Sequence, residues 1–370
     1  MNERFDAVII GGGPAGASAA IALARAGRSV AVLERSDYGQ VCIGETLPPD
    51  ARVPLARLGV WHRFLADDHA PSPGTASAWG QEELEENHFI FNPYGNGWHL
   101  DRRRFDALLA SAAVEAGADL QRNARMTGCE QASSSGWQVE YVRDERPCRL
   151  HARFLVDATG RACIPSRRQG ARRLRIDRLT GVIGMFTARE QPQDYRTLVE
   201  AATDGWWYSA WLPDARLVVA WMTDADLLPR GQSQLHAHWQ RRLGETLHTR
   251  SRAIGQTGGQ TGEMTLDQPL RLIAAGSEIL ECSGGANWLA TGDAALSFDP
   301  LSSQGIYKAL QSGLLTAEVI GEAFRGHASA VRELSFRNRR SFERYLETRR
   351  DYYSREQRWP VSAFWRRRLC

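Results

Sequence analysis

The sequence predicts an α/β protein: a Rossmann-type dinucleotide-binding domain, interrupted by an antiparallel β domain and followed by a helical segment. Three observations lead to this fold class. A Gly-x-Gly-x-x-Gly turn follows an apolar strand at residues 6–10. Strand-like segments joined by short turns fill residues 181–226. An α/β pattern returns near Trp288, so the first domain is discontinuous, and 370 residues suffice for two domains of about 150 residues each.

The first βαβ unit contains every part of a dinucleotide site in order. In such a turn the first glycine allows the tight bend, the second lets a pyrophosphate approach the backbone, and the third lets helix and strand pack closely. A helix over residues 17–26 would offer free N–H groups to the phosphates. A second strand, residues 29–33, ends at an acidic side chain that would accept ribose hydroxyls. The predicted contacts of this unit are Gly11, Gly13, Pro14, Ala15, Gly16, Glu34 and Arg35.

The next elements continue the α/β pattern. Residues 102–116 have the apolar spacing of an amphipathic helix. Residues 137–142 and 149–156 have the pattern of strands, and the second leads into the segment Asp157-Ala-Thr-Gly160. We therefore expect a helix and a strand pair between the first βαβ unit and the β domain.

The inserted β domain is predicted from alternating polarity. Its strands span residues 181–188, 206–212 and 217–223. Along the middle strand, alternation puts Trp207 and Trp211 on one face of the sheet and Trp206 and Tyr208 on the other. Beyond the sheet we expect a helix over 232–247, a strand over 288–292 and a long helix from Ile306.

These elements define three expected parts. The dinucleotide-binding domain comprises residues 1–70, 100–170 and 270–325, the β-rich substrate domain residues 71–99 and 171–269, and the helical C-terminal segment residues 326–370. From Arg325 onward there are thirteen Arg against five acidic residues. This basic, aromatic segment either docks an acidic or substrate protein or packs as a solvated helix over the core.

Composition excludes several classes. A net charge of +3, with neither zinc-ligand spacing nor a recognition module, speaks against nucleic-acid binding. No apolar run is long enough to span a membrane, and Glu3 and Asp6 lie where a signal peptide would be basic. The six cysteines lack Cys-x-x-Cys spacing. The sequence therefore predicts a cytoplasmic protein with reduced thiols and no metal site.

Three further segments identify the dinucleotide. They are Gly44-Glu-Thr-Leu-Pro-Pro49, Arg102-x-x-Phe-Asp-x-x-Leu109, and Trp288-Leu-Ala-Thr-Gly-Asp-Ala-Ala295 followed by Phe298-Asp-Pro-Leu-Ser-Ser-Gln-Gly-Ile306. This set resembles the flavoprotein monooxygenases of the para-hydroxybenzoate hydroxylase type, in the branch that contains the flavin-dependent halogenases. The resemblance implies FAD as the cofactor. It adds as FAD contacts Glu45, Thr46, Arg102, Asp157, Gly160, Gly292, Asp293, Pro300, Ser303, Gly305 and Ile306.

Two of these contacts also have a physical basis. Asp293 would hold ribityl or ribose hydroxyls, or it would cap a turn. The helix that begins near Gly305 would point its N-terminus at the flavin pyrimidine edge, where negative charge develops on reduction.

Within that branch the chain is similar to the small flavoproteins that hydroxylate a peptidyl tryptophan during maturation of quinone-cofactor oxidases. The likeness rests on residues 44–49, 205–209 and 298–306 and on the short chain. It implies hydroxylation of an aromatic ring, such as tryptophan free or in a peptide or protein, through a flavin C4a-hydroperoxide. Reduced nicotinamide or a partner flavin reductase would supply the electrons.

Halogenation is the competing interpretation, and two departures count against it. The halogenase motif Trp-x-Trp-x-Ile-Pro would fall on residues 208–213, where Tyr208 and Ala210 replace both tryptophans. Halogenases also use a lysine after the second strand, yet residues 34–98 contain none and Lys308 is the only lysine in the chain. The sequence is also compatible with an FAD-dependent reductase of isoprenoid double bonds and with a non-enzymatic flavoprotein scaffold.

Four features are candidates for the chemistry. Glu45 could accept the ring proton, or it could bind backbone N–H groups. His99 could reach the substrate, and Asp299, before a proline, is a weaker acid or base that could instead shape its turn. Large flat side chains suit an aromatic ligand, so the predicted substrate pocket consists of Trp207, Trp211 and Trp221, with core packing as the alternative.

Overall fold

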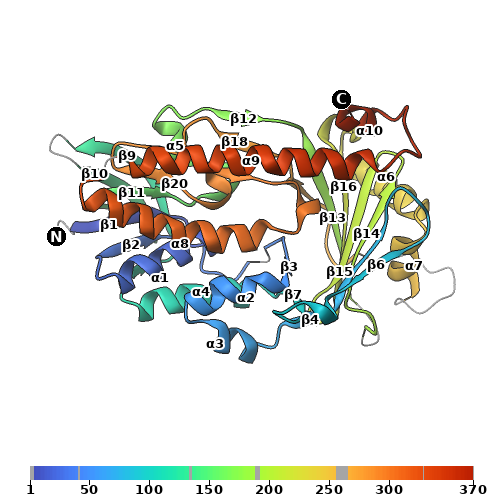
Figure 1. The fold of residues 1–370 in the computed structure, drawn as a ribbon, viewed down its shortest axis with the longest axis horizontal. Helices are drawn as coiled ribbons and strands as arrows, with labels where there is room; N and C mark the ends of the chain where they lie inside the picture. The colour runs from blue at the N-terminus through green and yellow to red at the C-terminus, as the bar shows by residue number, and fades with distance from the viewer. Residues whose placement is uncertain are drawn as a thin grey trace.

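The computed structural model describes residues 4–40, 42–132, 136–187, 192–255, 266–327 and 329–369. It confirms the predicted fold class: a parallel α/β half and an antiparallel sheet lie side by side, and a long C-terminal helix runs along both (Figure 1). Among the described helices, none is both long enough and apolar enough to cross a membrane.

The α/β half is built on an eight-stranded sheet. Its main order is β19 (Gly284–Gly285), β20 (Trp288–Ala290), β11 (Arg146–Asp157), β1 (Arg4–Ile10), β2 (Val30–Leu33) and β8 (Asp119–Gln121), with β10 (Gly136–Arg143) and β9 (Ala124–Ala132) continuing from β11. The strands β20, β11, β1, β2 and β8 run parallel. Because β1 lies in the middle, its C-terminal end opens where ligands bind in such sheets.

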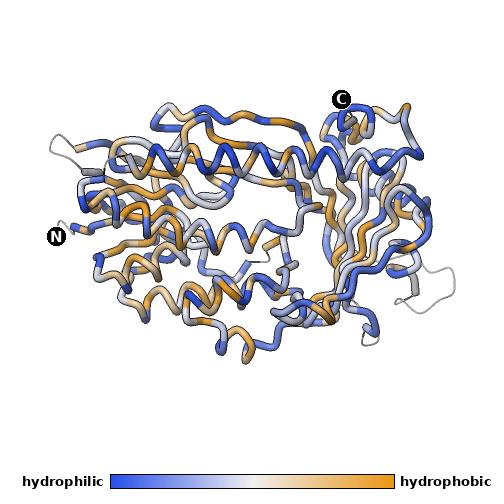
Figure 2. The backbone as a smooth tube through the Cα atoms, viewed as in Figure 1, coloured by the Kyte–Doolittle hydropathy of each residue, from blue (hydrophilic) through white to orange (hydrophobic). Residues whose placement is uncertain are grey.

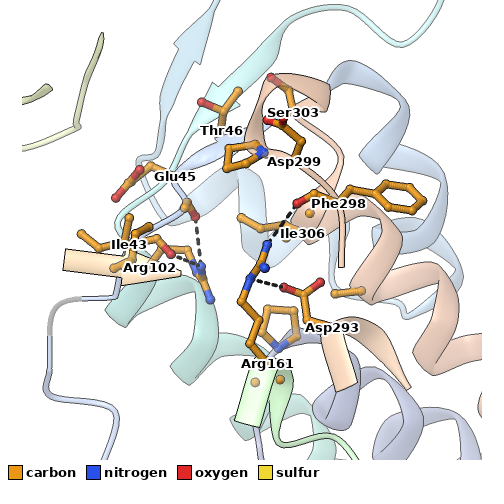
Figure 3. Close-up of a pocket in the computed structure, with 18 of the residues that line it drawn as sticks. Ile43, Glu45, Thr46, Arg102, Arg161, Asp293, Phe298, Asp299, Ser303 and Ile306 are labelled. Atoms are coloured by element: carbon orange, nitrogen blue, oxygen red, sulfur yellow. Dashed lines mark hydrogen bonds and ion pairs between the residues drawn. The ribbon is translucent and has the colours of Figure 1, made fainter. Parts of the chain in front are cut away.

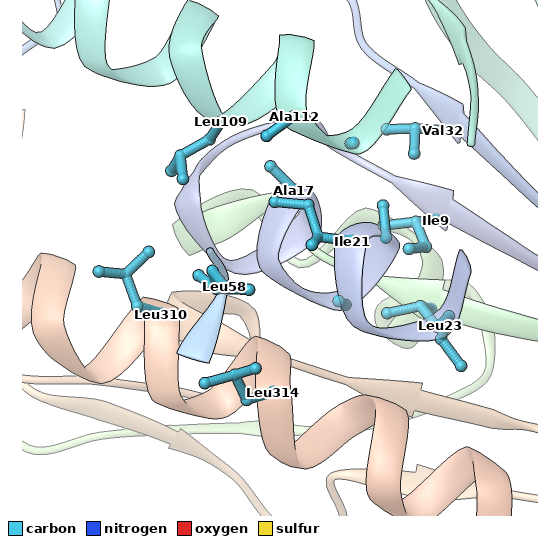
Figure 4. Packing of buried hydrophobic residues seen from close by; sticks show 14 of the residues in the cluster. Ile9, Ala17, Ile21, Leu23, Val32, Leu58, Leu109, Ala112, Leu310 and Leu314 are labelled. Carbon is cyan, nitrogen blue, oxygen red and sulfur yellow. The ribbon is translucent and has the colours of Figure 1, made fainter. Parts of the chain in front are cut away.

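Three helices enclose the buried core on one face of this sheet. α1 (Pro14–Arg25) is rich in alanine and starts with a proline, which is favourable at the first helical position. Figure 4 shows α1 packed between α4 (Arg102–Glu115) and α8 (Gly305–Phe324). The contact with α8 is close because Gly313 faces the backbone of Ala15, and a Cβ there would collide with the Ala15 carbonyl oxygen. The N-terminus of α8 is thereby fixed beside that of α1.

The antiparallel sheet has seven strands. Their order is β17 (Arg271–Ala274), β13 (Leu179–Thr187), β16 (Arg216–Asp224), β15 (Gly205–Trp211), β14 (Thr197–Ala202), β5 (Gly74–Ala78) and β6 (Glu85–His88). All pairs are antiparallel except β14 and β5. Alternation along β15 is as predicted, since Trp207 and Trp211 share one hydrophobic cluster while Trp206 and Tyr208 belong to another.

Smaller elements join the two halves. One three-stranded sheet contains β3 (Thr46–Leu47), β7 (Gly97–His99) and β4 (Ala70–Ser72), and another contains β12 (Arg173–Arg175), β18 (Glu278–Leu280) and β21 (Leu296–Ser297). The shorter helices are α2 (Arg52–Arg57), α3 (Trp61–Ala66), α5 (Ile164–Arg168), α6 (Gln232–Gly244) and α7 (His248–Gly255). The described 3₁₀ turns are η1 (Pro49–Ala51), η2 (Phe89–Phe91), η3 (Gly160–Ala162), η4 (Ala225–Leu227), η5 (Gly292–Ala294) and η6 (Pro300–Ser302).

The C-terminal segment forms α9 (Ala330–Ser354) and α10 (Ala363–Leu369). Figure 2 shows many hydrophilic residues along α9, in contrast to the hydrophobic strands and α1 below it. The aromatic end of the segment is core: Tyr353, Phe364 and Trp365 are fully buried and cluster with Trp79. These aromatic rings therefore pack against the sheet. Of the two alternatives for this segment, packing over the core holds for the rings, and the prediction that they dock a substrate protein is wrong.

Candidate active site

A cavity of about 390 Å³ lies between the two halves, where the N-termini of α1 and α8 face the antiparallel sheet. Figure 3 shows it with Arg102 and Arg161 reaching in from different elements. Most of the residues predicted from the motifs meet there. Those that line the cavity are Gly13, Pro14, Ala15, Glu45, Thr46, Arg102, Gly160, Asp293, Asp299, Pro300, Ser303, Gly305 and Ile306.

The glycine-rich turn has the shape that a pyrophosphate requires. Gly11 has φ +105°, and a Cβ there would collide with the carbonyl of Ala158. A Cβ on Gly16 would collide with the Gly11 carbonyl, so both positions need glycine. Above Gly13, by contrast, there is open space. The first turn of α1 has neither a side-chain cap nor an acidic residue, so its N–H groups are available to an anion.

Several predicted cofactor contacts lie outside the cavity wall. Gly11 and Gly16 shape the turn, Gly292 (φ +59°) lines a different cleft, and Arg35 is exposed. Glu34 accepts a hydrogen bond from the N–H of Gly12 at 2.7 Å, so it holds the turn in place; a contact from it to ribose stays a prediction.

Asp157 is fully buried and has a structural role instead. Its carboxylate accepts hydrogen bonds from the N–H and hydroxyl groups of Thr159 and of Ser166. Four donors occupy its two oxygens, and its side chain is not part of the cavity lining. The prediction that it contacts the cofactor is corrected: Asp157 orders the turn that presents Gly160.

An arginine fixes the turn that carries Glu45. Arg102 Nη1 donates to the carbonyl oxygens of Ile43 and Gly44 at 3.1 and 3.0 Å. Its Nε and Nη2 donate to Asp106 at 3.1 and 2.9 Å, one turn further along α4. Gly44 has φ +99°, a conformation that favours glycine. The turn is thus held at both carbonyls, which directs Glu45 into the cavity.

Glu45 is the carboxylate best placed for proton transfer. The residue is 3 % exposed, and its Oε1 has no hydrogen-bond partner among the described residues. Burial raises the pKa of Glu45 to about 7, against the opposing charge of Arg102 and nearby backbone N–H groups. At neutral pH the two protonation states are therefore close in population, which is what a general acid or base needs.

The opposite wall of the cavity is apolar apart from one phenol. Tyr208 on β15 shares a 2.7 Å hydrogen bond with the hydroxyl of Thr46. Burial, and next the charge of Glu45, raise the pKa of Tyr208, so the phenol stays protonated. Around it lie Ile183, Val218, Ala220, Met222 and Ile273. Sequence reasoning missed this face: alternation separated Tyr208 from Trp207, but it could not tell which face the cavity occupies.

The three predicted pocket tryptophans lie on the other face of the sheet. Trp207 and Trp221 stack with their ring centroids 5.9 Å apart, and Trp239 of α6 packs edge-on against Trp207. Trp211 joins the same buried cluster, and none of the three lines the cavity. The pocket prediction is therefore wrong, because these large rings fill the core between the sheet and α6.

His99 is also a structural residue. It is fully buried, and its Nδ1 and Nε2 lie 2.9 Å from the Trp211 carbonyl oxygen and 3.0 Å from the Thr197 hydroxyl. Burial lowers the pKa of His99 to about 4, so it stays neutral. With both nitrogens engaged and no place in the cavity lining, it does not have the predicted catalytic role.

Asp299 borders the cavity, but its carboxylate is fully engaged. One oxygen accepts from the N–H of Leu301 at 3.0 Å. The other accepts from the hydroxyl of Tyr353 at 2.7 Å and from Arg349 Nε at 3.3 Å. This geometry supports the turn-shaping alternative and corrects the catalytic one. Asp299 connects the loop before α8 to α9.

Basic residues surround Asp293 in the cavity wall. Lys308 Nζ lies 3.1 Å from Asp293 Oδ1, and Arg161 Nε lies 3.7 Å from Oδ2. Burial acts to raise the pKa of Asp293, but Lys308 and Arg161 outweigh it and lower the pKa below its usual range. Asp293 is therefore an anion that can accept hydroxyl hydrogen bonds. Arg161, which lines the cavity, was missed although it directly follows the predicted contact Gly160.

These residues fit FAD. The glycine turn leaves room above Gly13 for a pyrophosphate, and positions Gly160 and Gly305 also open onto free space. The first turn of α8 has no side-chain cap, so its N–H groups can bind the flavin pyrimidine edge. The buried Oγ1 of Thr291, in the cavity wall, has no partner within the described ranges. Within those same ranges no group of His, Cys, Asp or Glu could hold a metal ion.

The fold and the site define an FAD-dependent oxidoreductase, and the FAD binding domain family matches residues 4–342, so the chain belongs to that family. It is 32 % identical to a protein of Marinomonas mediterranea named as an FAD-dependent oxidoreductase, LodB, over 99 % of this chain and 97 % of the relative.

Two solved structures are similar over nearly the whole chain. The myxobacterial chondrochloren halogenase CndH has a TM-score of 0.87 and 26 % identity, over 100 % of this chain and 86 % of its own. The peptidyl tryptophan dihydroxylase QhpG has a TM-score of 0.80 and 25 % identity, over 99 % of this chain and 78 % of its own.

Proposed function

We propose that the protein is an FAD-dependent monooxygenase that hydroxylates an aromatic ring, with tryptophan, free or in a peptide or protein, as the substrate class. The single observation that carries this proposal is Glu45: a buried carboxylate in the cavity wall, with an unpartnered oxygen and a pKa near 7. Such a group can take the proton that an aromatic carbon loses when oxygen is added to it.

The balanced reaction converts an aromatic C–H bond, O₂, two electrons and two protons into a C–OH bond and water. Bound FAD supplies the two-electron chemistry that activates O₂. Ile183, Val218, Ala220 and Met222 exclude water from the reacting ring. Tyr208 and Thr46, joined by their hydrogen bond, present polar groups that orient the ring, and Glu45 accepts the ring proton.

The substrate class rests on the likeness to a relative that acts on peptidyl tryptophan, and on a cavity wall that is apolar over one side. The electron source that we propose is reduced nicotinamide or a partner flavin reductase. We place the enzyme in the cytoplasm, because Cys42, Cys129, Cys148, Cys163 and Cys282 are all free thiols, as expected in a reducing compartment.

Halogenation is the second candidate, and the similarity to CndH favours it. The position of the only lysine counts against it. Lys308 Nζ is bonded to Asp293 and lies 4.4 Å from the centroid of the Phe298 ring, and its side chain is not among those that line the active-site cavity. A lysine that directs an electrophilic halogen would have to face the substrate.

One reaction distinguishes the two candidates. Purified protein, FAD, a flavin-reducing system, air and bromide are mixed with a panel of free and peptide-bound tryptophans and phenols, and the products are identified by mass spectrometry. We expect addition of oxygen alone to a tryptophan. Addition of bromine, recognised from its isotope doublet, would replace the hydroxylase proposal with the halogenase. Absence of any new product from an enzyme whose FAD is reduced and reoxidised would contradict both.

A further inference from the structure

A second, larger cleft of about 620 Å³ lies between α8 and α9, on the other side of η5 from the active-site cavity. Its walls are one side of α8, the facing side of α9, and the chain around Gly292 and Leu296. Thr291 borders both spaces, whereas Lys308 belongs to this cleft alone. The FAD contacts described above do not account for its residues on α9.

The cleft is strongly positive. Five cationic side chains line it: Arg57, Lys308, Arg337, Arg340 and Arg344. Among the described lining residues the one carboxylate belongs to Glu318, which pairs with Arg57 at 3.0 Å. The charge of Lys308 is paired with the carboxylate of Asp293, whose side chain lines the active-site cavity. The uncompensated charge therefore comes from the three arginines of α9.

These three arginines form one row of exposed side chains along α9. Their spacing of three and four residues places them on one side of α9. Within the part of the chain that the structure describes, none of their guanidinium groups makes a hydrogen bond or an ion pair. Arg349, one turn beyond the row, pairs instead with Asp177 and Asp299. What distinguishes the three arginines from the rest of the Arg-rich segment is their shared position in the cleft wall.

The chemistry of the cleft matches a phosphate-bearing molecule. Guanidinium groups present paired N–H donors that bind phosphate oxygens in a bidentate manner. Neutral polar side chains on the same walls, Gln311, Asn338 and Ser341, can reach the hydroxyl groups of a sugar. The volume lies within the range of about 300–1,000 Å³ that is typical of sites for small organic ligands.

We propose that the cleft between α8 and α9 binds a nucleotide through its pyrophosphate group, with Arg337, Arg340 and Arg344 as the phosphate-binding residues. This site is separate from the glycine-rich turn of the FAD site. The two sources of this chemistry are a nicotinamide dinucleotide and an adenine nucleotide, and both carry the pyrophosphate that the arginines recognise. Binding at this cleft needs no turnover, so it stands independently of the hydroxylation reaction.

The test is calorimetric titration of the FAD-saturated protein with NADP⁺, ADP and inorganic pyrophosphate. The variant Arg337→Gln/Arg340→Gln/Arg344→Gln, called the row variant, removes the three positive charges of the row. The matched control Arg332→Gln/Arg339→Gln/Arg355→Gln removes the same charge from the same C-terminal segment, outside the residues that line the cleft. Flavin absorbance in each sample shows that FAD remains bound.

We expect NADP⁺ or ADP to bind more tightly than pyrophosphate. We also expect the row variant to lose about tenfold or more in affinity, and the control variant to keep the wild-type affinity. The nucleotide that binds more tightly identifies the source. The proposal would be overturned if neither nucleotide bound, or if the row variant bound the nucleotide with wild-type affinity. It would also be overturned if the control variant lost as much affinity as the row variant, because that result would mean a general effect of net charge.

Discussion

At the residue scale, the catalytic account depends on the protonation of Glu45. Burial raises its pKa to about 7, and only the carboxylate form can accept a proton from the substrate ring. We expect the rate of product formation to rise with pH through about 7 and then to level off. The rate is measured as hydroxylated product per unit time with FAD kept reduced.

The variant Glu45→Gln tests this assignment. The amide keeps the shape of the side chain but cannot take a proton. We expect a rate about 10²–10⁴-fold lower and without the rise near pH 7, and partial recovery in Glu45→Asp. Equal FAD content in all variants is the control. A Glu45→Gln enzyme with the full product yield would restrict Glu45 to a structural role.

The same pKa has a consequence for stability. A carboxyl whose folded pKa lies above its ordinary value of 4.5 stays protonated in the folded chain while the unfolded chain ionises. Stability is therefore lost as pH rises from 4.5 to about 7. Converted at 1.36 kcal/mol per pKa unit, the loss is about 3 kcal/mol, taken as an upper figure.

We expect Glu45→Gln, which has no charge to bury, to be more stable than the wild type at pH 8 and to match it near pH 4. Denaturant unfolding at both pH values measures this difference. A constant difference at the two pH values would show that Glu45 does not titrate in this range.

At the element scale, β16 offers a direct comparison of the two faces of the sheet. Val218 lines the active-site cavity, and its neighbour Val219 lies in the tryptophan cluster on the other face. Both are buried. We expect Val218→Ala to change the KM for the aromatic substrate, and Val219→Ala to leave KM unchanged.

Both variants should lower the free energy of unfolding by about 1–3 kcal/mol, because each leaves a small cavity. Steady-state kinetics and denaturant unfolding of the pair separate substrate contact from core packing. A change of KM in Val219→Ala that equals the change in Val218→Ala would mean that the cavity has been assigned to the wrong face.

The same strands show how far the sequence could predict the structure. Alternation along β15 was correct, because the period of a strand is fixed by its geometry. Which face receives a ligand depends on what packs against each side, and Trp239 of α6 covers the tryptophan face from far along the chain. Aromatic character alone therefore predicted the substrate pocket on the tryptophan face of the sheet. It did not identify Tyr208 and the aliphatic residues on the other face as the residues that line the cavity.

Motif reasoning succeeded where the backbone itself makes the site. The glycine-rich turn, the Gly44–Thr46 turn and the loop from Pro300 to Ile306 line one cavity, as the family resemblance implied, and their contacts with FAD stay a prediction. It failed for Asp157, His99 and Asp299, because a motif shows that a polar residue is present but not which donors occupy it. Those partners include Trp211, Tyr353 and Arg349, which are distant in sequence.

At the scale of the whole molecule, α9 connects the loop before α8 to the antiparallel sheet. The hydroxyl of Tyr353 donates to Asp299 and accepts from Trp206 Nε1 at 2.9 Å. Tyr353 is fully buried, so both bonds are made away from water. We expect Tyr353→Phe to lower the free energy of unfolding by about 1.5–3 kcal/mol and to weaken FAD binding, because the loop from residue 298 to residue 306 loses its support.

The neighbouring variant Tyr352→Phe is the matched control, since Tyr352 packs against Trp79 and does not contact Asp299. FAD affinity is measured by fluorescence quenching, and stability by denaturant unfolding. If both variants bound FAD as the wild type does, α9 would be a passive cover and not a support for the cofactor loop.

The measurement that tests the central claim most directly follows isotopically labelled O₂ into product, in the wild type and in Glu45→Gln. Each enzyme is given reduced FAD and a tryptophan-containing substrate, and both the product and hydrogen peroxide are quantified. We predict one labelled oxygen on the aromatic ring in the wild type. In Glu45→Gln we predict FAD oxidation diverted to hydrogen peroxide with little ring product. Unlabelled ring oxygen in the wild type, or a wild-type yield of labelled product from Glu45→Gln, would contradict the account.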